Sequence, residues 1–293
     1  MTPGATTRPH LVERAAELLA RQAPAVAEPP GPPPLAWPDA TPTARVASGF
    51  AAPITLEALR AAGLLSGQPN AAQHRMREEI AMVQHQLLRQ VDDTATATPV
   101  QRRIVLLASA LPGEGKSFLS LNLAHGIASR GARPVLLVDA DGKAESLTAL
   151  LGAGGRPGLR ELIAAATGRG TDFVLETAVE RLSFLPSGLA LPVDSNAPRG
   201  TVAAAIQRLA AALPEHILIL DSPACLSSSE ATALAGVAGQ VLLVVAAERT
   251  LRHEVEAALD ALDACPVLRL VLNHVRLGAH GGHDAARAEQ AHA

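Results

Sequence analysis

The chain of 293 residues carries a net charge of -3 at pH 7 and has a pI of about 6.4. This balance gives no global basic field, so composition excludes a protein that binds nucleic acid through its overall charge. Hydrophobic residues make up 48% of the sequence and aromatic residues only 2%, so we expect a core of Ala, Leu, Val and Ile. No apolar run reaches the roughly 18 residues of a membrane span, and no signal-peptide pattern is present. We therefore expect a cytoplasmic protein in which Cys225 and Cys265 are buried, reduced thiols.

The first hundred residues predict helices separated by a proline-rich linker. Residues 10–20 place leucines and alanines on one helical face, which is typical either of a small docking helix or of a fraying terminal helix. The PPGPPP run favours an extended linker. Two helical patterns follow, the first ending near Gly63 and the second covering HRMREEIAMVQHQLLRQV. We divide this part into an N-terminal helix (1–23), a linker (24–53) and a helical extension (54–98).

Beyond Arg103, short apolar runs alternate with helical patterns. This alternation predicts one doubly wound α/β domain with a mainly parallel sheet, over 99–277, followed by a flexible tail at 278–293. The expected strands are 104–109, 134–139, 182–186, 216–221, 240–246 and 267–272. The expected helices are 117–130, 159–166, 201–213 and 251–262. Ligands of such sheets bind beyond the carboxyl ends of the strands.

A phosphate-loop motif lies between the first strand and its helix. ALPGEGKS fits GxxxxGK[ST] at every defining position except the first glycine, which is Ala110. The glycines let backbone N–H groups turn toward an anion, Lys116 reaches the outer phosphates, and the Ser117 hydroxyl binds magnesium. We expect ATP and Mg²⁺ as cofactors. The expected nucleotide-binding residues are Pro112, Gly113, Glu114, Gly115, Lys116, Ser117 and Phe118.

Three carboxylates end two apolar strands. Asp139 and Asp141 end VLLVDAD, and Asp221 ends ILILDSP. Each alone is as typical of a turn as of a site, but with the phosphate loop they form one magnesium-nucleotide site. Asp221 is the expected Walker B ligand; of the other two, one serves the metal and one orients a nucleophile. We assign catalysis to Lys116, Asp139 and Asp141, and the metal to Ser117, Asp139 and Asp221.

Polar residues after the last two strands have two interpretations each. Asn273 is placed either to read the adenine edge or to end a strand in a turn. Arg249 either lines the site or caps the next helix, and for Thr250 we prefer the cap. In the tail, His280 and His283 fit a solvated terminus better than a metal site.

The motifs SALPGEGKS, VLLVDAD and ILILDSP resemble the Walker A, A′ and B motifs of the bacterial tyrosine kinases that control capsule and exopolysaccharide synthesis. Further segments, such as ITLEALRAAGLL and LVLNHV, resemble the exosortase-associated tyrosine autokinase branch. The resemblance implies a P-loop NTPase fold of the deviant-Walker, partition-ATPase-like type. It also implies a transmembrane polysaccharide co-polymerase as activator, recruitment to the inner membrane face through that partner, and a homo-oligomer.

The sequence departs from this family in two regions. The chain contains no tyrosine, so it cannot phosphorylate itself on tyrosine. In the helix that follows the paired Glu78 and Glu79, the residues Ala81, Gln84 and His85 stand where the family has basic ones, which weighs against rings built through that helix.

Three functions follow from these observations. The first is a kinase-like regulator of exopolysaccharide synthesis or export that phosphorylates a partner or acts as a nucleotide switch. The second is a partition or positioning ATPase, which Leu111 disfavours because that group carries a second lysine there. The third is a catalytically silent adaptor for a membrane polysaccharide co-polymerase.

Overall fold

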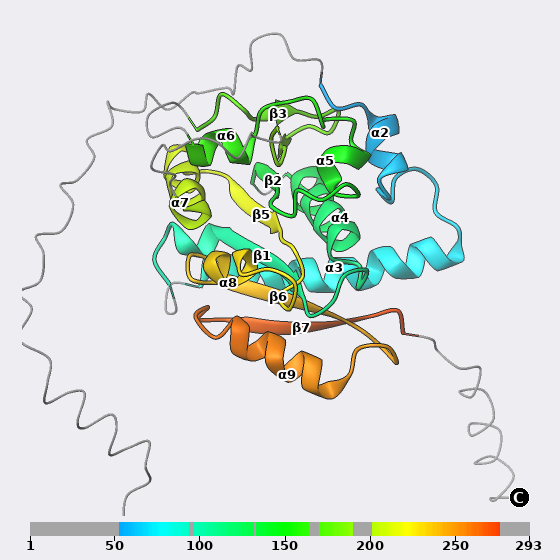
Figure 1. The fold of residues 1–293 in the computed structure, drawn as a ribbon. Helices are drawn as coiled ribbons and strands as arrows, with labels where there is room; N and C mark the ends of the chain where they lie inside the picture. Colours follow the sequence, from blue (N-terminus) through cyan, green and yellow to red (C-terminus); the bar gives the residue numbers. More distant parts are fainter. Residues whose placement is uncertain (1–52, 94–96, 132, 165–169, 190–200, 276–293) are drawn as a thin grey trace, which may run out of the picture. The chain divides into compact units, whose positions relative to one another are not determined.

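The computed structural model describes residues 53–93, 97–131, 133–164, 170–189 and 201–275 (Figure 1). The predicted helix at 10–20, most of the linker and the histidine-containing tail lie outside these residues. Within the described chain, no helix combines the length and the apolar character that crossing a bilayer requires.

One seven-stranded sheet forms the centre of the fold, in the order β3-β4-β2-β5-β1-β6-β7 (Figure 1). All neighbouring strands are parallel except β3, which pairs antiparallel with β4. The strands are β1 (Ile104–Ser109), β2 (Val135–Asp139), β3 (Leu175–Glu176), β4 (Leu182–Leu185), β5 (Ile217–Asp221), β6 (Gln240–Ala246) and β7 (Leu268–Asn273). The six parallel strands are the six predicted ones, and the prediction of a mainly parallel doubly wound sheet is confirmed.

Helices precede and connect the strands. They are α2 (Leu56–Ala61), α3 (Ala71–Asp92), η1 (Gln101–Arg103), α4 (Lys116–Ser129), α5 (Leu147–Leu150), α6 (Leu159–Ala164), α7 (Val202–Ala212), α8 (Glu230–Ala235) and α9 (Arg252–Ala261). The short α5 and α8 were not predicted, because neither is long enough to show helical periodicity.

Both faces of the sheet are covered by helices, as the strand sequences require. Ile104 and Leu106 of β1 lie in a core layer with residues of α6, α7, α8 and α9. Val105 and Leu107, which alternate with them, lie in a second layer with residues of α2, α3, α4 and α5. Buried strands of this kind are apolar on both faces, which explains their continuous apolar runs. As expected from composition, Phe184 is the only aromatic side chain in the described buried core.

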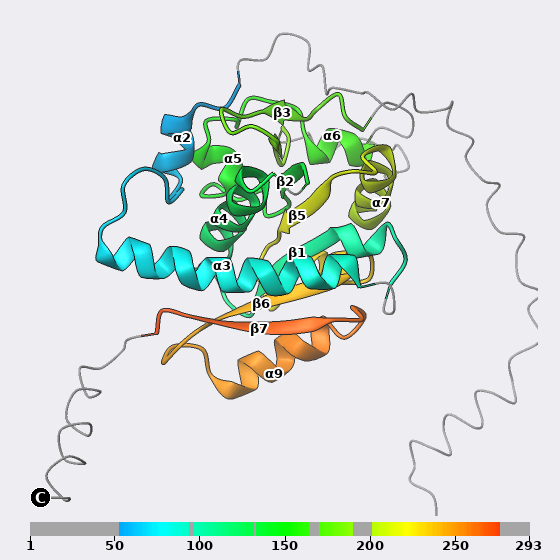
Figure 2. The same cartoon turned by 180° about the vertical axis from the view of Figure 1, so that it is seen from behind.

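The helices of the 54–98 segment pack onto the nucleotide-binding domain. Helix α3 crosses one face of the sheet (Figure 2), with Leu87 and Val91 fully or almost fully buried in the second core layer. The helix begins at the Asn70 N-cap, where Asn70 and Gln73 form reciprocal capping hydrogen bonds. This segment therefore shares the hydrophobic core of the sheet.

Both cysteines are free and buried, as expected. Cys225 lies in the loop after β5 and donates its backbone N–H to Ser109 O at 2.8 Å. Burial raises the pKa of its thiol to about 11. The loop after β5 is thus joined to the end of β1, next to the phosphate loop.

Candidate nucleotide-binding site

The phosphate loop joins β1 to α4 through two residues with left-handed backbone. Gly113 has a φ of 78° and Gly115 a φ of 98°. A Cβ on Gly115 would also collide with the Asn273 amide, so glycine is required there for both reasons. Helix α4 begins at Lys116, directly after Gly115. Its free N–H groups and positive dipole end therefore meet the turn, which is the arrangement that binds phosphate.

The side chain of Glu114 points into the protein. It is fully buried, and its carboxylate accepts hydrogen bonds from Leu111 N at 2.7 Å and Ala246 N at 3.0 Å, and from the Thr250 hydroxyl. Leu111 belongs to the phosphate loop, whereas Ala246 and Thr250 lie at and after the end of β6. Glu114 therefore fixes the loop to the segment after β6. It can offer a nucleotide only its backbone.

The expectation that Thr250 caps the following helix is wrong. The N-cap residue of α9 is Leu251, whose N–H donates to the Glu254 carboxylate at 2.8 Å. Of the two interpretations of Arg249, the structure favours the site. Its guanidinium lies 3.6 and 3.7 Å from the place that a Cβ on Gly113 would occupy. The β6–α9 connection thus brings one positive charge to the outer edge of the loop.

Asn273 ends β7 next to the phosphate loop. Its amide donates to Glu114 O at 2.8 Å, so the side chain supports the loop directly. Phe118 lies in the first turn of α4, but its ring packs toward Gly63, at 3.1 Å from where a Cβ would be. Of the predicted nucleotide-binding residues, Phe118 therefore presents its backbone, and Pro112 lies exposed at the outer edge of the loop.

Lys116 is buried, with 6% of its surface exposed. Its ammonium group has no hydrogen-bond or ion-pair partner in the part of the chain that the structure describes. A cationic side chain with so little exposed surface and no ion pair fits an anionic ligand. The neighbouring Ser117 is partly exposed at the same helix end.

Asp221 ends β5 and is fully buried beside the phosphate loop. Its Oδ1 lies 3.2 Å from the Ser120 hydroxyl, whereas Oδ2 has no hydrogen-bond partner. Burial raises the pKa of Asp221 to about 7; the Ser117 hydroxyl and the Lys116 ammonium oppose the rise, and Asp139 adds to it. A free, buried carboxylate oxygen beside a hydroxyl is a suitable ligand set for Mg²⁺.

Asp139 and Asp221 are paired in register on neighbouring strands, which brings the two carboxylates to one edge of the sheet. The Asp139 side chain is buried, and both of its carboxylate oxygens already accept hydrogen bonds. Oδ1 accepts from Asp141 N at 3.0 Å and Gly142 N at 3.3 Å, and Oδ2 accepts from Thr148 N at 2.7 Å. Asp139 thus organises the turn that follows β2. This engagement leaves it less lone-pair capacity for a metal than Asp221 has.

Asp141 is turned differently from Asp139. Its Oδ1 lies 3.2 Å from the Lys143 ammonium, and 14% of its side chain is exposed. Asp141 adds to the raised pKa of Asp221, so the two carboxylates act on each other electrostatically. The structure therefore gathers Lys116, Asp139, Asp141 and Asp221 at one end of the sheet. Among the described residues, no three His, Cys, Asp or Glu side chains form a complete metal cage, and Mg²⁺ usually completes its shell with phosphate and water.

Two residues that support the site, Ser120 and Thr250, were not predicted. Ser120 contacts both Asp221 Oδ1 and Lys116 O, the latter at 2.9 Å. Helical spacing was a usable signal for it, because Ser120 lies one turn after Lys116 on the same helix. The anchoring of Glu114 by Thr250 had no local signal, because the two residues are 136 positions apart.

Known proteins share this arrangement of strands and loop. The kinase domain of the Escherichia coli tyrosine kinase ETK superposes with a TM-score of 0.52 at 23% identity, over 62% of this chain and 71% of that domain. At this identity the likeness establishes the fold. No protein-family model matches the chain.

Sequence relatives are named as tyrosine kinases as well. EpsB of Ralstonia nicotianae, named as a tyrosine-protein kinase, is 34% identical over 164 residues, covering 54% of this chain and 21% of EpsB. The tyrosine-protein kinase YwqD of Bacillus subtilis is 29% identical over 189 residues, covering 61% of this chain and 76% of YwqD. The chain is thus similar in sequence to bacterial tyrosine kinases. It spans only about a fifth of the length of EpsB, as the 21% coverage states.

As a bacterial tyrosine kinase homologue the chain is atypical in helix α3. Gln84 is buried against α4, with 1% of its surface exposed, and Ala81 is half-buried. Of the three positions at which the family resemblance implies basic residues, only His85 faces solvent. Of these three positions, only His85 is therefore exposed for contact with another molecule.

Proposed function

We propose that the chain binds ATP with Mg²⁺ at the phosphate loop and transfers the γ-phosphoryl group to a tyrosine of another protein. The observation that carries the proposal is that a lysine without an ion pair and a carboxylate oxygen without a hydrogen bond lie close together beside the phosphate loop. The largely buried Lys116 forms no ion pair with any described residue, and Asp221 Oδ2 is buried without a hydrogen bond. A magnesium-bound triphosphate supplies what both lack.

Each residue has a distinct part in this proposal. Lys116 and the N–H groups at the start of α4 bind the outer phosphates, and Ser117 and Asp221 hold the metal. The metal, when bound, neutralises charge on the phosphates. Asp141, which is partly exposed, accepts the proton of the attacking tyrosine hydroxyl. Asp139 positions Asp141 through the hydrogen bond to its backbone N–H.

The acceptor belongs to another molecule because the 293 residues contain no tyrosine. The relatives are named tyrosine-protein kinases, which supports a tyrosine acceptor over a serine or threonine one. From the family resemblance we place the protein in exopolysaccharide synthesis or export, in the exosortase-associated branch. A transmembrane co-polymerase is the proposed activator, and it would bring the protein to the inner face of the membrane.

The test is incubation of the purified protein with ATP carrying a radiolabelled γ-phosphate, alone and with a tyrosine-containing tail peptide from a candidate activator. We expect label on the peptide and none on the chain. Asp141→Asn should abolish label transfer while ATP affinity changes little. Free phosphate without labelled peptide would support a nucleotide switch, and retained ATP without either product would support an adaptor; both outcomes overturn the kinase proposal.

A further inference from the structure

Arg249 lies in the turn between β6 and α9, against the phosphate loop. The two terminal nitrogens of its guanidinium lie 3.6 and 3.7 Å from the place that a Cβ on Gly113 would occupy. Both residues are exposed, so a ligand can approach them from solvent. A full positive charge therefore stands beside the loop that the site offers to phosphate.

The turn that carries Arg249 is fixed at both of its ends by one carboxylate oxygen. Before the turn, Ala246 N donates to Glu114 Oε1 at 3.0 Å, and after it the Thr250 hydroxyl donates to the same oxygen. Glu114 is itself a residue of the phosphate loop, and it is fully buried. Because the turn and the loop share this anchor, the fold determines where Arg249 stands relative to the loop.

The backbone of the turn is strained next to Arg249. Glu248 has a φ of 59°, in the left-handed region that residues with a side chain rarely adopt. The turn is closed by a hydrogen bond from Ala247 N to Asn273 O at 2.8 Å. Backbone strain of this kind is concentrated at functional sites. Here the strained residue directly precedes the arginine that lies against the loop.

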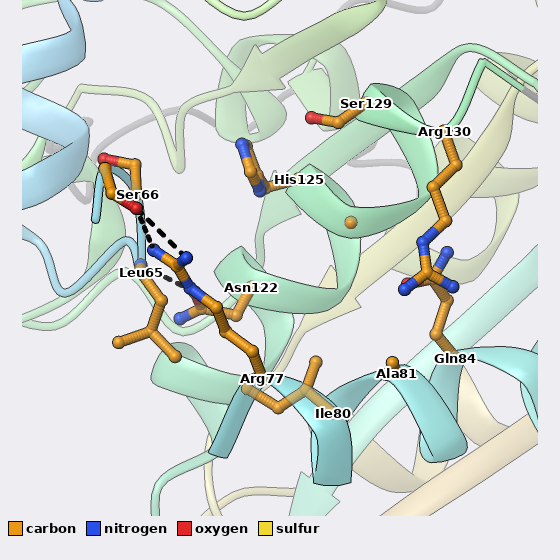
Figure 3. A pocket seen from close by; sticks show the side chains of 12 residues that line it. Leu65, Ser66, Arg77, Ile80, Ala81, Gln84, Asn122, His125, Ser129 and Arg130 are labelled. Atoms are coloured by element: carbon orange, nitrogen blue, oxygen red, sulfur yellow. Dashed lines mark hydrogen bonds between the residues drawn. The ribbon is translucent and has the colours of Figure 1, made fainter. Parts of the chain in front are cut away.

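Other arginines that lie against backbone are held there by carbonyl groups of the chain. At the hollow between α3 and α4, the terminal nitrogens of Arg77 donate to Gly67 O at 3.1 Å (Figure 3). Arg103 donates to three carbonyl groups. Among the residues that the structure describes, the Arg249 guanidinium has neither a hydrogen-bond acceptor nor an ion pair. Water solvates it, so its N–H groups are available to a ligand.

We propose that Arg249 is a further nucleotide ligand that contacts the γ-phosphate of ATP. This role rests on the proposed function, in which Lys116 and the start of α4 bind the nucleotide. In a phosphate loop, backbone N–H groups hold the α- and β-phosphates and the lysine reaches the β- and γ-phosphates. The γ-phosphate therefore has the fewest contacts within the loop. A guanidinium can donate two parallel hydrogen bonds to its oxygens.

This contact would make the site selective for a triphosphate. ADP keeps the phosphates that Lys116 and the start of α4 bind, but it has no γ-phosphate for Arg249. The arginine would therefore contribute to the affinity for ATP and little to the affinity for ADP. After phosphoryl transfer the contact would be lost, which favours release of ADP.

The test is calorimetric titration of the full chain with Mg²⁺ and a non-hydrolysable ATP analogue and, separately, with Mg²⁺ and ADP. Arg249→Gln removes the charge and keeps much of the side-chain length. It should weaken binding of the analogue about tenfold or more, because a charge-assisted contact is lost. Its affinity for ADP should stay within about twofold of the wild type, which also shows that the variant is folded. Arg249→Lys keeps the charge without the paired N–H groups, so its affinity for the analogue should lie between the two.

Arg252→Gln is the matched control. It removes the same charge three positions later, where Arg252 is exposed and its Nε lies 2.8 Å from the Glu256 carboxylate. Exposed ion pairs contribute little, so both nucleotide affinities should stay within about twofold of the wild type. An equal loss for the analogue in Arg252→Gln and Arg249→Gln would indicate a general effect of net charge and overturn the assignment of Arg249.

The ratio of the two nucleotide affinities separates the remaining outcomes. A guanidinium can also stack on an aromatic ring, and stacking on adenine would contribute equally to ATP and ADP binding. Equal losses for both nucleotides in Arg249→Gln, or no loss for either, would therefore overturn the γ-phosphate contact and leave the proposed nucleotide site standing. A wild type that binds neither nucleotide would overturn both.

Discussion

Thr250 and Glu114 are joined by a hydrogen bond that connects the end of the β6 segment to the phosphate loop across 136 residues of sequence. The Glu114 carboxylate also holds Leu111 and Ala246. The shape of the phosphate loop therefore depends on a residue that no phosphate-loop motif includes. Thr250 is a positioning residue for the proposed nucleotide site.

Thr250→Val tests this dependence, since it removes the hydroxyl and keeps the side-chain shape. A hydrogen bond to a charged group contributes about 1.5–3 kcal/mol, so the free energy of unfolding should fall by about that amount. ATP affinity should fall several-fold because Glu114 loses one of its three donors. Urea denaturation and calorimetric titration with Mg·ATP measure the two effects.

Thr201→Val is the control for Thr250→Val. Thr201 caps α7, where its hydroxyl accepts from Ala204 N at 3.2 Å, and it lies outside the phosphate loop. Loss of an N-cap costs about 0.5–2 kcal/mol of stability. ATP affinity should stay within twofold. Equal ATP affinities in Thr250→Val and Thr201→Val would refute the positioning role of Thr250.

Gly115→Ala should damage the loop through both backbone and packing. The residue has a φ of 98°, and its new methyl group would collide with the Asn273 amide. The backbone alone costs about 1–3 kcal/mol for a residue with a side chain. Thermal unfolding and ATP titration should both show a clear loss. Gly154→Ala has open space around its Cβ, and it should leave ATP affinity unchanged; comparable losses in both variants would contradict the steric argument.

Asp221 should make the ligand-free protein less stable as pH rises. Its folded-state pKa is about 7, above an unfolded value of about 4, so the folded protein holds the extra proton between these values. The contribution of the neutral carboxyl is complete below about pH 4 and is lost as pH approaches 7. A shift of this size corresponds to roughly 4 kcal/mol. Asp221→Asn should remove this loss of stability between pH 4 and pH 7.

The measurement is urea denaturation in EDTA at pH 5 and pH 8, for the wild type and for Asp221→Asn. Relative to the wild type, the variant should gain stability between the two pH values. Asp263→Asn, at an exposed position, should keep the wild-type dependence. An unchanged pH dependence in Asp221→Asn would mean that Asp221 is not the titrating group.

The parallel strands were predictable because a buried strand is apolar on both faces and gives a continuous run, as in Ile104–Ser109. Strand β3 was not, because Leu175–Glu176 is too short to show any pattern. The phosphate loop was predictable because its chemistry needs glycine, lysine and a hydroxyl at fixed spacing.

The directions of the side chains at the site could not be predicted from the sequence. Glu114 lies inside the motif, yet its carboxylate turns away from the loop because Ala246 and Thr250 provide donors there. Asp139 and Asp141 both stand at the end of the same apolar run, so the sequence does not distinguish them. In the structure, three backbone N–H groups donate hydrogen bonds to the carboxylate of Asp139 and none of these three to that of Asp141. Such contacts depend on how distant segments meet, which no local pattern encodes.

In the proposed site, Lys116 binds the outer phosphates of ATP. This role is tested by calorimetric titration of the full chain with Mg²⁺ and a non-hydrolysable ATP analogue, for the wild type and for Lys116→Ala. We predict one site in the wild type and a loss of roughly 100-fold or more in affinity in the variant, because a charge-assisted contact to the phosphates is removed. Equal affinity in the two proteins would contradict the claim.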